Sequence, residues 1–456
     1  MWCFMQNKDK NPMLTGVIWK QVLRFFFPIL IGVFFQQLYN TVDAVVVGRF
    51  AGKAALASVG GSSGQVLNFL FSFFMGLSTG ATVIIAHAFG ADHPERVDDA
   101  LHTTYAFGLV GGSIFGAVGF LFTKPLLRLL QTPADLMPSS ILYVRILMAG
   151  MVFALLYNMC SGILRAVGDS KRPLFILIGC CGANIVLDAL FVAVFRMGVL
   201  GAAIATVLCQ AFSAVVTTWL LVKKTPQLRL RLSRLRIKPD VLKKILSIGL
   251  PTAIAGSMFS ISNMILQTAI NRMGIDEVAA WTAYGKVDSL WWMINQAFST
   301  AITTFVGQNY GAGLTDRVRK GTRQVLMIEM ATAVVMTIAF NIFGPVLLSL
   351  FTTDSHVVDL GMQLVRMLTP FYAVYAISEI TGATLRAEGH VLVNTAANLI
   401  GVCVFRIIWV TLVFPSGTFR QTLACYPISW TLITIFIAGF YLRNQEKILA
   451  GIGAED

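Results

Sequence analysis

Charged residues are scarce in this chain. Only 12% of its 456 residues are Asp, Glu, Lys or Arg, whereas 56% are hydrophobic. A soluble domain usually devotes about a quarter of its residues to charge, so the composition excludes an ordinary soluble protein and predicts a polytopic membrane protein. The apolar segments are continuous and lack the alternation of ten-residue membrane strands, which excludes a transmembrane β-barrel.

Catalytic signatures are also missing. The chain contains no Walker loop, no GxSxG elbow and no HExxH pair, and its five histidines are scattered. We therefore predict that it is not an enzyme and uses no cofactor, and that an ion gradient drives any transport. None of the cysteines stands in a CxxC pair, and six lie in apolar spans, so we interpret them as small buried hydrophobic residues. They are Cys3, Cys160, Cys180, Cys181, Cys209, Cys403 and Cys425.

Long uncharged runs recur along the chain, each close to the roughly 20 residues that a helix needs to cross a bilayer. The N-terminus lacks the short apolar region and cleavage site of a signal peptide. We predict an all-α integral membrane fold with twelve transmembrane helices, at 23–47, 55–83, 100–123, 139–164, 173–195, 198–222, 245–272, 277–305, 323–351, 360–385, 391–414 and 419–442.

The basic residues are distributed unevenly between the two sides of these spans. With the N-terminus inside, the inner segments hold 24 of the 35 Lys and Arg residues, the outer segments hold seven, and four lie within spans. This excess is the positive-inside signal. It accounts for the net charge of +13 without a nucleic-acid partner, and it predicts a multi-pass protein of the plasma membrane (the cell inner membrane) with both termini in the cytoplasm.

The chain contains an internal repeat. The hydrophilic stretch 223–244 divides the spans six and six, which predicts an N-terminal lobe at 1–222, a cytoplasmic linker and a C-terminal lobe at 245–456. Pro28 aligns with Pro251, and LRAVG at 164–168 aligns with LRAEG at 385–389 at an offset of 221. Because each unit has six spans, the two pseudo-symmetric lobes have the same orientation, as in transporters built from parallel repeats.

Four polar residues stand at a similar depth in the first lobe. Counting 1.5 Å per residue along each predicted helix puts Asp43, Asp188 and Thr206 in the outer half of the bilayer. Asn184 lies four residues before Asp188, on the same helical face. Two carboxylates, an amide and a hydroxyl offer oxygen ligands for a small cation, and two neighbouring acids also suit proton uptake and release. We predict a cation or proton site here, a metal site if the ion is Na⁺.

The repeat provides an internal control for this prediction. Asp43 aligns with Leu266 and Asp188 aligns with Trp409, so the second lobe lacks both acids and the chemistry is assigned to the first. Pro28 stands fifteen residues before Asp43 in the first span. A proline inside a helix removes a hydrogen bond and permits a kink, so we predict a hinge at Pro28.

Five further charged residues within or near spans are considered as candidates. Lys286 and Asp288 are two residues apart and do not share a helical face; we expect each either to line a cavity or to pair across helices. Glu379 falls in the inner half of the tenth span, away from the first-lobe cluster. Glu329 falls near the inner end of the ninth span, where we expect it at the membrane interface. For Arg406 we expect a role in stabilising the second lobe rather than ligand contact.

The sequence resembles the multidrug and toxic compound extrusion (MATE) family over residues 15 to 442. The resemblance rests on NTVDAVVVGRFAG in the first span, the paired segments STGATVIIAHAFGAD and STAITTFVGQNYGAG, LRAVGDSKRP after the fourth span and NIVLDALF in the fifth. It implies two six-helix lobes that form a V and export cationic or amphipathic drugs in exchange for H⁺ or Na⁺.

The resemblance also implies roles for particular residues. Members of the family bind a cation in the first lobe through positions that match Asp43, Asn184, Asp188 and Thr206, and bending at a proline that matches Pro28 is a proposed coupling step. Some members also carry acids in the seventh and tenth helices, and this sequence has none in the seventh.

These observations predict a secondary active multidrug efflux antiporter. We expect small drug-like substrates, surrounding membrane lipid, H⁺ or Na⁺ as the coupling ion, and a monomer. A flippase for lipid-linked precursors from the same superfamily is the alternative, although such proteins usually have fourteen spans and a basic cavity. The major facilitator plan also has six plus six helices, but its basic loop motif is absent from AFGADHPERVDDA after the second span.

Overall fold

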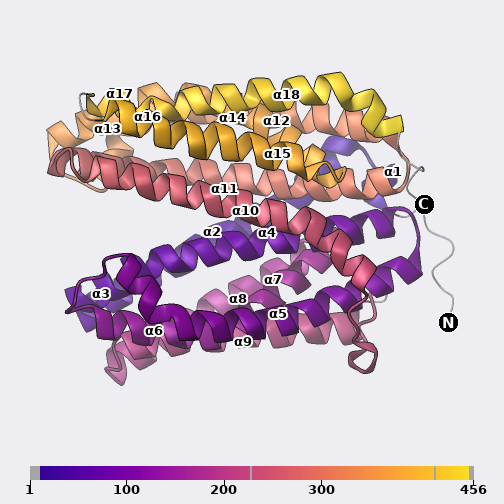
Figure 1. The fold of residues 1–456 in the computed structure, drawn as a ribbon, viewed down its shortest axis with the longest axis horizontal. Helices are drawn as coiled ribbons and strands as arrows, with labels where there is room; N and C mark the ends of the chain where they lie inside the picture. Colours follow the sequence, from indigo (N-terminus) through magenta and orange to yellow (C-terminus); the bar gives the residue numbers. More distant parts are fainter. Residues whose placement is uncertain (1–10, 226–227, 415–416, 451–456) are drawn as a thin grey trace. The chain divides into compact units, whose positions relative to one another are not determined.

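The computed structural model describes residues 11–225, 228–414 and 417–450; Cys3 and the other residues up to residue 10 lie outside this range. Within it every regular element is a helix (Figure 1). The α-helices are α1 (Pro12–Thr15), α2 (Ile18–Val46), α3 (Lys53–Gly60), α4 (Ser62–Gly90), α5 (Pro94–Leu129), α6 (Met137–Ala149), α7 (Met151–Ala166), α8 (Lys171–Asp188), α9 (Val199–Trp219), α10 (Pro239–Ile270), α11 (Ile275–Gly311), α12 (Thr315–Ser349), α13 (Ser355–Leu368), α14 (Tyr372–Ala387), α15 (Val391–Asn398), α16 (Phe405–Val413), α17 (Phe419–Leu423) and α18 (Cys425–Ala450).

All twelve predicted spans fall on helices. Among the described residues, nine helices are long and apolar enough to cross a membrane, and α6 with α7 makes a tenth span, bent by 48°. The two remaining predicted spans correspond to α11 and to α13 with α14, which carry charged side chains such as Asp288 and Glu379. The prediction of an all-helical membrane fold is confirmed. The six cysteines within the described residues are free and buried, as predicted.

Several spans contain a π-helical segment that the sequence did not indicate. These segments are η2 (Val47–Ala51), η3 (Ala189–Val194), η4 (Leu220–Lys224) and η7 (Leu399–Val404). A π turn widens the helix by one residue per turn, re-aims the side chains beside it, and often occurs at functional sites. Segments η2 and η3 pack against each other, so two of these irregular turns meet within one unit.

The chain folds as two compact units. The first holds residues 27–253, and the second holds the described parts of 8–26 and 254–456. Helix α2 therefore changes unit one residue before Pro28, and α10 changes unit two residues after Pro251. The two prolines are matched by the internal repeat, so each lobe's first helix passes from one unit to the other at its proline.

Glycine permits a close helix crossing in the first unit. A Cβ atom at Gly76 would lie 2.3 Å from the backbone of Ala253, and one at Gly80 would lie 2.4 Å from the carbonyl oxygen of Ile245. The early part of α10 therefore contacts the backbone of α4 directly. In the second unit the early part of α2 packs through aromatic side chains instead, because Phe26 stacks on Phe298 with ring centroids 4.1 Å apart.

The segment that follows α9 is bound to the first unit. Leu228 and Leu230 are buried in its apolar core. The Arg231 amide donates to Nε2 of His102 at 3.0 Å, and the Arg236 guanidinium pairs with Asp99 at 2.9 Å. This stretch therefore follows the surface of α5.

The two units have cores of different composition. The first is mainly aliphatic, with Leu77 and Leu155 among its buried side chains, and also includes Phe74. The second is built on large aromatic side chains, in which Trp291 stacks on Tyr372 with ring centroids 4.8 Å apart and an interplanar angle of 8°.

Candidate functional site

The four residues of the predicted cation or proton site lie in the first unit and come from three helices. Asp43 is on α2, Asn184 and Asp188 are on α8, and Thr206 is on α9. Their exposed fractions are 8%, 1%, 0% and 6%, respectively. Burial of two carboxylates within an apolar helical unit is costly, so these positions call for a specific explanation.

The π-helical turns stand directly beside the two acids. Asp43 lies four residues before η2, and Asp188 is the last residue of α8, immediately before η3. Because η2 and η3 pack against each other, the irregular turns bring the carboxylate-bearing parts of α2 and α8 together. The sequence alone gave no sign of these turns.

Two tyrosines that sequence reasoning missed complete the cluster. The Tyr39 hydroxyl donates to the Thr206 hydroxyl at 3.2 Å, and the charges of Asp43 and Asp188 both act on Tyr39. The same two charges act on Tyr143 of α6, which is 4% exposed. Tyr39 could have been found because it lies one turn before Asp43 on the same face, whereas nothing in the sequence connects α6 to this site.

The polar atoms of this cluster are largely unsatisfied. Among the described residues, Oδ1 of Asp43, both carboxylate oxygens of Asp188 and both amide atoms of Asn184 are buried without a hydrogen-bond partner. Asp43 and Asp188 also lie close enough for their charges to interact. Two buried like charges without a compensating cation are unstable. The donor set therefore fits a proton or a small cation, because carboxylate, amide and hydroxyl oxygens are ligands for hard cations.

The acid on α11 is fully bonded, unlike the first-unit acids. The Asp288 carboxylate accepts hydrogen bonds from the indole of Trp292 at 2.7 Å, from the hydroxyl of Tyr284 at 3.1 Å, and from the hydroxyl of Tyr372. Lys286 is exposed. Of the two alternatives for Asp288, cavity lining or pairing across helices, the geometry favours pairing.

Glu379 and Arg386 form an ion pair on α14. An Arg386 nitrogen lies 2.7 Å from Oε1 of Glu379. The expectation for Glu329 was wrong. Its side chain is 0% exposed and bonds to Asn295, because α12 turns this residue toward α11 rather than toward the interface.

Arg406 is buried in the second unit without a carboxylate partner among the described residues. Its guanidinium donates to the Ser429 hydroxyl at 3.1 Å and to the Asn263 amide oxygen at 3.3 Å. It also lies 4.0 Å from the ring centroid of Tyr426, a cation–π contact. These contacts tie the guanidinium of Arg406 to α10 and α18.

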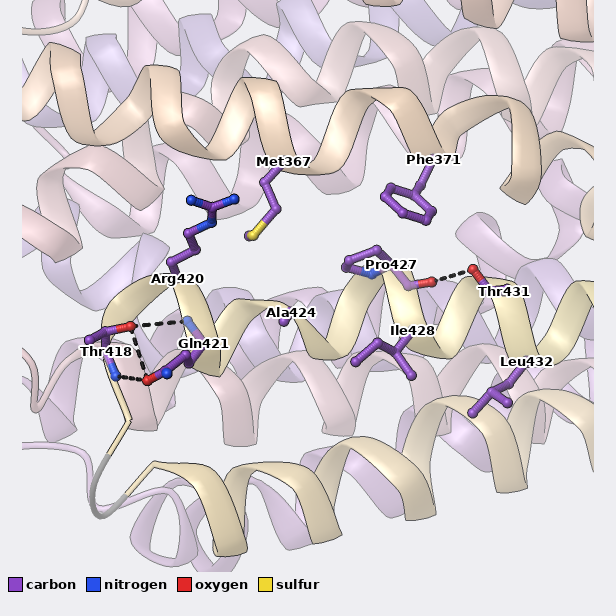
Figure 2. A pocket seen from close by; sticks show the side chains of 10 residues that line it. All are labelled: Met367, Phe371, Thr418, Arg420, Gln421, Ala424, Pro427, Ile428, Thr431 and Leu432. Atoms are coloured by element: carbon purple, nitrogen blue, oxygen red, sulfur yellow. Dashed lines mark hydrogen bonds between the residues drawn. The ribbon is translucent and has the colours of Figure 1, made fainter.

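A pocket of about 610 Å³ opens in the second unit (Figure 2). It contains none of the predicted site residues. Figure 2 shows Arg420 and Met367 near one end and Phe371 above Pro427 near the other. The sides are mainly apolar, and Arg420 is the only charged residue among the ten that line the pocket.

The helical spans define a multi-pass membrane protein with a buried polar cluster in its first unit. A family model described as MatE matches residues 28–190 and 251–412. These two stretches cover well over half of the chain and fall on the two halves of the internal repeat. The chain therefore belongs to the MatE family, and the resemblance drawn from the sequence motifs is confirmed.

Known proteins resemble the chain over nearly its whole length. It is 29% identical to the probable multidrug resistance protein YoeA of Bacillus subtilis, over 94% of this chain and 95% of the relative. It is 30% identical to the probable multidrug resistance protein YpnP of the same organism, over 86% and 87%. A solved structure described as the outward-facing conformation of a multidrug resistance MATE family transporter has a TM-score of 0.89, with 23% identity, over 97% and 99%.

Proposed function

We propose that this protein is a secondary active antiporter that exports cationic or amphipathic compounds in exchange for H⁺ or Na⁺. Its relatives YoeA and YpnP are named as probable multidrug resistance proteins, which supports drug-like substrates. The positive-inside distribution supports cytoplasmic termini, and we propose a monomer in which repeats at 1–222 and 245–456 are joined by the linker at 223–244.

One observation carries the proposal of ion coupling. The buried oxygens of Asp43 and Asp188 lack partners among the described residues, although the two charges interact. A carboxylate that only stabilised the fold would be hydrogen-bonded or paired, as Asp288 is. We infer that a proton or a sodium ion satisfies these oxygens for part of the transport cycle, with Asn184 and Thr206 as further ligands for sodium.

The position of Pro28 offers a way to convert ion occupancy into movement. An ion or proton reduces the repulsion between Asp43 and Asp188, and its departure restores that repulsion. Both acids are attached to helices, so the change in force acts on α2. Pro28 lacks the amide hydrogen that would brace α2 at this point, and α2 changes unit one residue before it. We infer that α2 bends there and that the bend favours substrate release.

The test is substrate efflux from proteoliposomes under Na⁺ and pH gradients imposed separately. We expect the wild-type protein to respond to one of the two gradients, which also identifies the coupling ion. Asp43→Asn should reduce gradient-driven efflux at least tenfold at equal protein density, because the amide cannot carry the exchanged charge.

The matched control is Asp135→Asn, which changes an exposed acid outside the helices of the first unit and should leave efflux unchanged. Unimpaired gradient-driven efflux by Asp43→Asn would refute ion coupling at this site.

A further inference from the structure

A second polar network lies inside the second unit and takes no part in the proposed coupling site. It consists of two bonded pairs, Asn295 on α11 with Glu329 on α12 and Glu379 with Arg386 on α14, and the charge of Glu379 acts on Glu329. These three helices pack tightly against one another. The network therefore occupies the interior of the unit.

Glu379 has partners at both carboxylate oxygens. Oε1 accepts hydrogen bonds from the Ser299 hydroxyl at 2.6 Å and from Arg386 at 2.7 Å. Oε2 accepts one from the Tyr375 hydroxyl at 3.3 Å. Because Arg386 supplies the opposite charge, Glu379 is stable as a carboxylate.

Glu329 has a different environment. Oε1 accepts a single hydrogen bond, from the amide of Asn295 at 2.8 Å. Oε2 is buried and has no partner among the described residues, and the whole side chain is 0% exposed. The nearby charge that acts on Glu329 is that of Glu379, which has the same sign. A buried carboxylate in such surroundings is costly unless it takes up a positive charge.

The other charged groups on the surrounding helices do not supply that charge. On α12 the preceding charged residue is Arg323, six residues away. On α13 Arg366 is exposed. On α11 Asp288 lies two turns before Asn295 and is bonded to aromatic side chains, and on α14 Arg386 is bonded to Glu379.

We propose that Glu329 is a proton-binding site of the second unit, which exchanges its proton with solvent through Glu379. The side chain of Glu379 is 18% exposed and that of Arg386 is 11% exposed, so this pair is the open end of the network. Glu379 takes a proton from a hydronium ion of the solvent, which becomes water, passes that proton to Oε2 of Glu329, and returns to its ion pair with Arg386. The number of protons is conserved at each step.

The internal repeat indicates that this site is particular to the second lobe. At the offset of 221, Glu329 aligns with Gly108 and Glu379 aligns with Asn158. The first lobe can therefore form no equivalent pair of carboxyl groups. This site goes beyond the proposed function and is independent of which ion binds Asp43.

Infrared difference spectroscopy of the purified protein after a pH change tests the proposal, because a protonated carboxyl group has its own carbonyl band. We expect a pH-dependent carboxyl band in the wild-type protein that is lost in Glu329→Gln and kept in Asp43→Asn. Glutamine has the shape of a protonated glutamate and can still accept from Asn295, which favours folding. Glu379→Gln should keep the band but slow its appearance at least tenfold.

Asn295→Ala provides a second measurement that does not alter either acid. It removes the only hydrogen bond to Oε1, which stabilises the ionised form, so the pH midpoint of the band should rise. A pH-dependent carboxyl spectrum that Glu329→Gln leaves unchanged, or an unchanged midpoint in Asn295→Ala, would each overturn the proposal. None of these results depends on efflux, so they leave the role of Asp43 to its own test.

Discussion

The two lobes share one sequence repeat but differ in the hydrogen-bond partners that they provide for buried carboxylates. In the first lobe, the charges of Asp43 and Asp188 interact, and most of their carboxylate oxygens lack hydrogen-bond partners among the described residues. The second has Leu266 and Trp409 at the matching positions. Its own acid Asp288 is enclosed by hydroxyl and indole donors. A buried acid can therefore be part of the fold or a site for an ion, and its partners distinguish the two.

The lobes differ in packing as well. The first unit allows α10 to contact α4 through Gly76 and Gly80, whereas Ala297 and Ala301 stand at the matching positions in the second. The second unit instead uses the ring contact between Phe26 and Phe298. Duplicated helices have thus diverged in the residues that set the distance between them.

The largest expected effect is on efflux, and it distinguishes the acids without partners in the first lobe from the hydrogen-bonded Asp288 in the second. Asp188→Asn should reduce gradient-driven efflux at least tenfold, because it removes one of the two charges that we assign to ion binding. Asp288→Asn should keep most of the efflux, since its carboxylate is held by Trp292 and Tyr284, and should mainly lower the melting temperature. Efflux by the two variants in the same proteoliposomes measures the difference, and equal losses would remove the distinction between the lobes.

The second-largest expected effect is on stability and concerns Glu388, which directly follows the last residue of α14. LRAEG places Glu388 where the first lobe has Val167, and both carboxylate oxygens of Glu388 are buried without a partner among the described residues. Burial raises the pKa of Glu388 from its ordinary value of 4.5 to about 8. The folded state therefore holds this proton more tightly than the unfolded state does. The stabilisation is complete below about pH 4.5 and is lost as the pH rises through 8.

Glu388→Val should make the two lobes alike at this position and remove that pH dependence. Its advantage over the wild-type protein should grow between pH 4.5 and 8, and reach roughly 4 kcal/mol at the alkaline end. Thermal unfolding in detergent across this range provides the measurement. A difference that stays constant with pH would show that Glu388 does not titrate in the folded protein.

The smallest expected effect concerns the helix crossing. Gly80→Ala should destabilise the first unit by roughly 1–3 kcal/mol, because the added carbon would meet the backbone of Ile245 and Gly249 and force a shift. The matched change Ala301→Gly removes a carbon from the second unit and should cost about 1 kcal/mol. Melting temperatures of both variants test the comparison. If Gly80→Ala is the milder of the two, glycine does not set the spacing in the first unit.

Some residues of the candidate site could be predicted from the sequence, and others could not. The helix content and the apolar positions place Asp43 and Asp188 at similar depths, and Asn184 follows from its spacing of four residues. Tyr143 could not be predicted, since only the packing of α6 brings it to the acids. Glu329 was assigned to the interface because its position in the sequence gives its depth, but not the direction in which α12 turns the side chain.

The sequence by itself determined the class of this protein, its repeat and the lobe that carries the paired acids. These properties depend on the hydrophobicity of single segments and on comparison of the two halves, which are local quantities. Only the tertiary structure decided which acids are satisfied. Asp288 and Glu379 have donors, whereas Asp43, Asp188 and one oxygen of Glu329 do not. A hydrogen bond requires atoms about 3 Å apart, and helices that are distant in sequence reach that separation only when they pack.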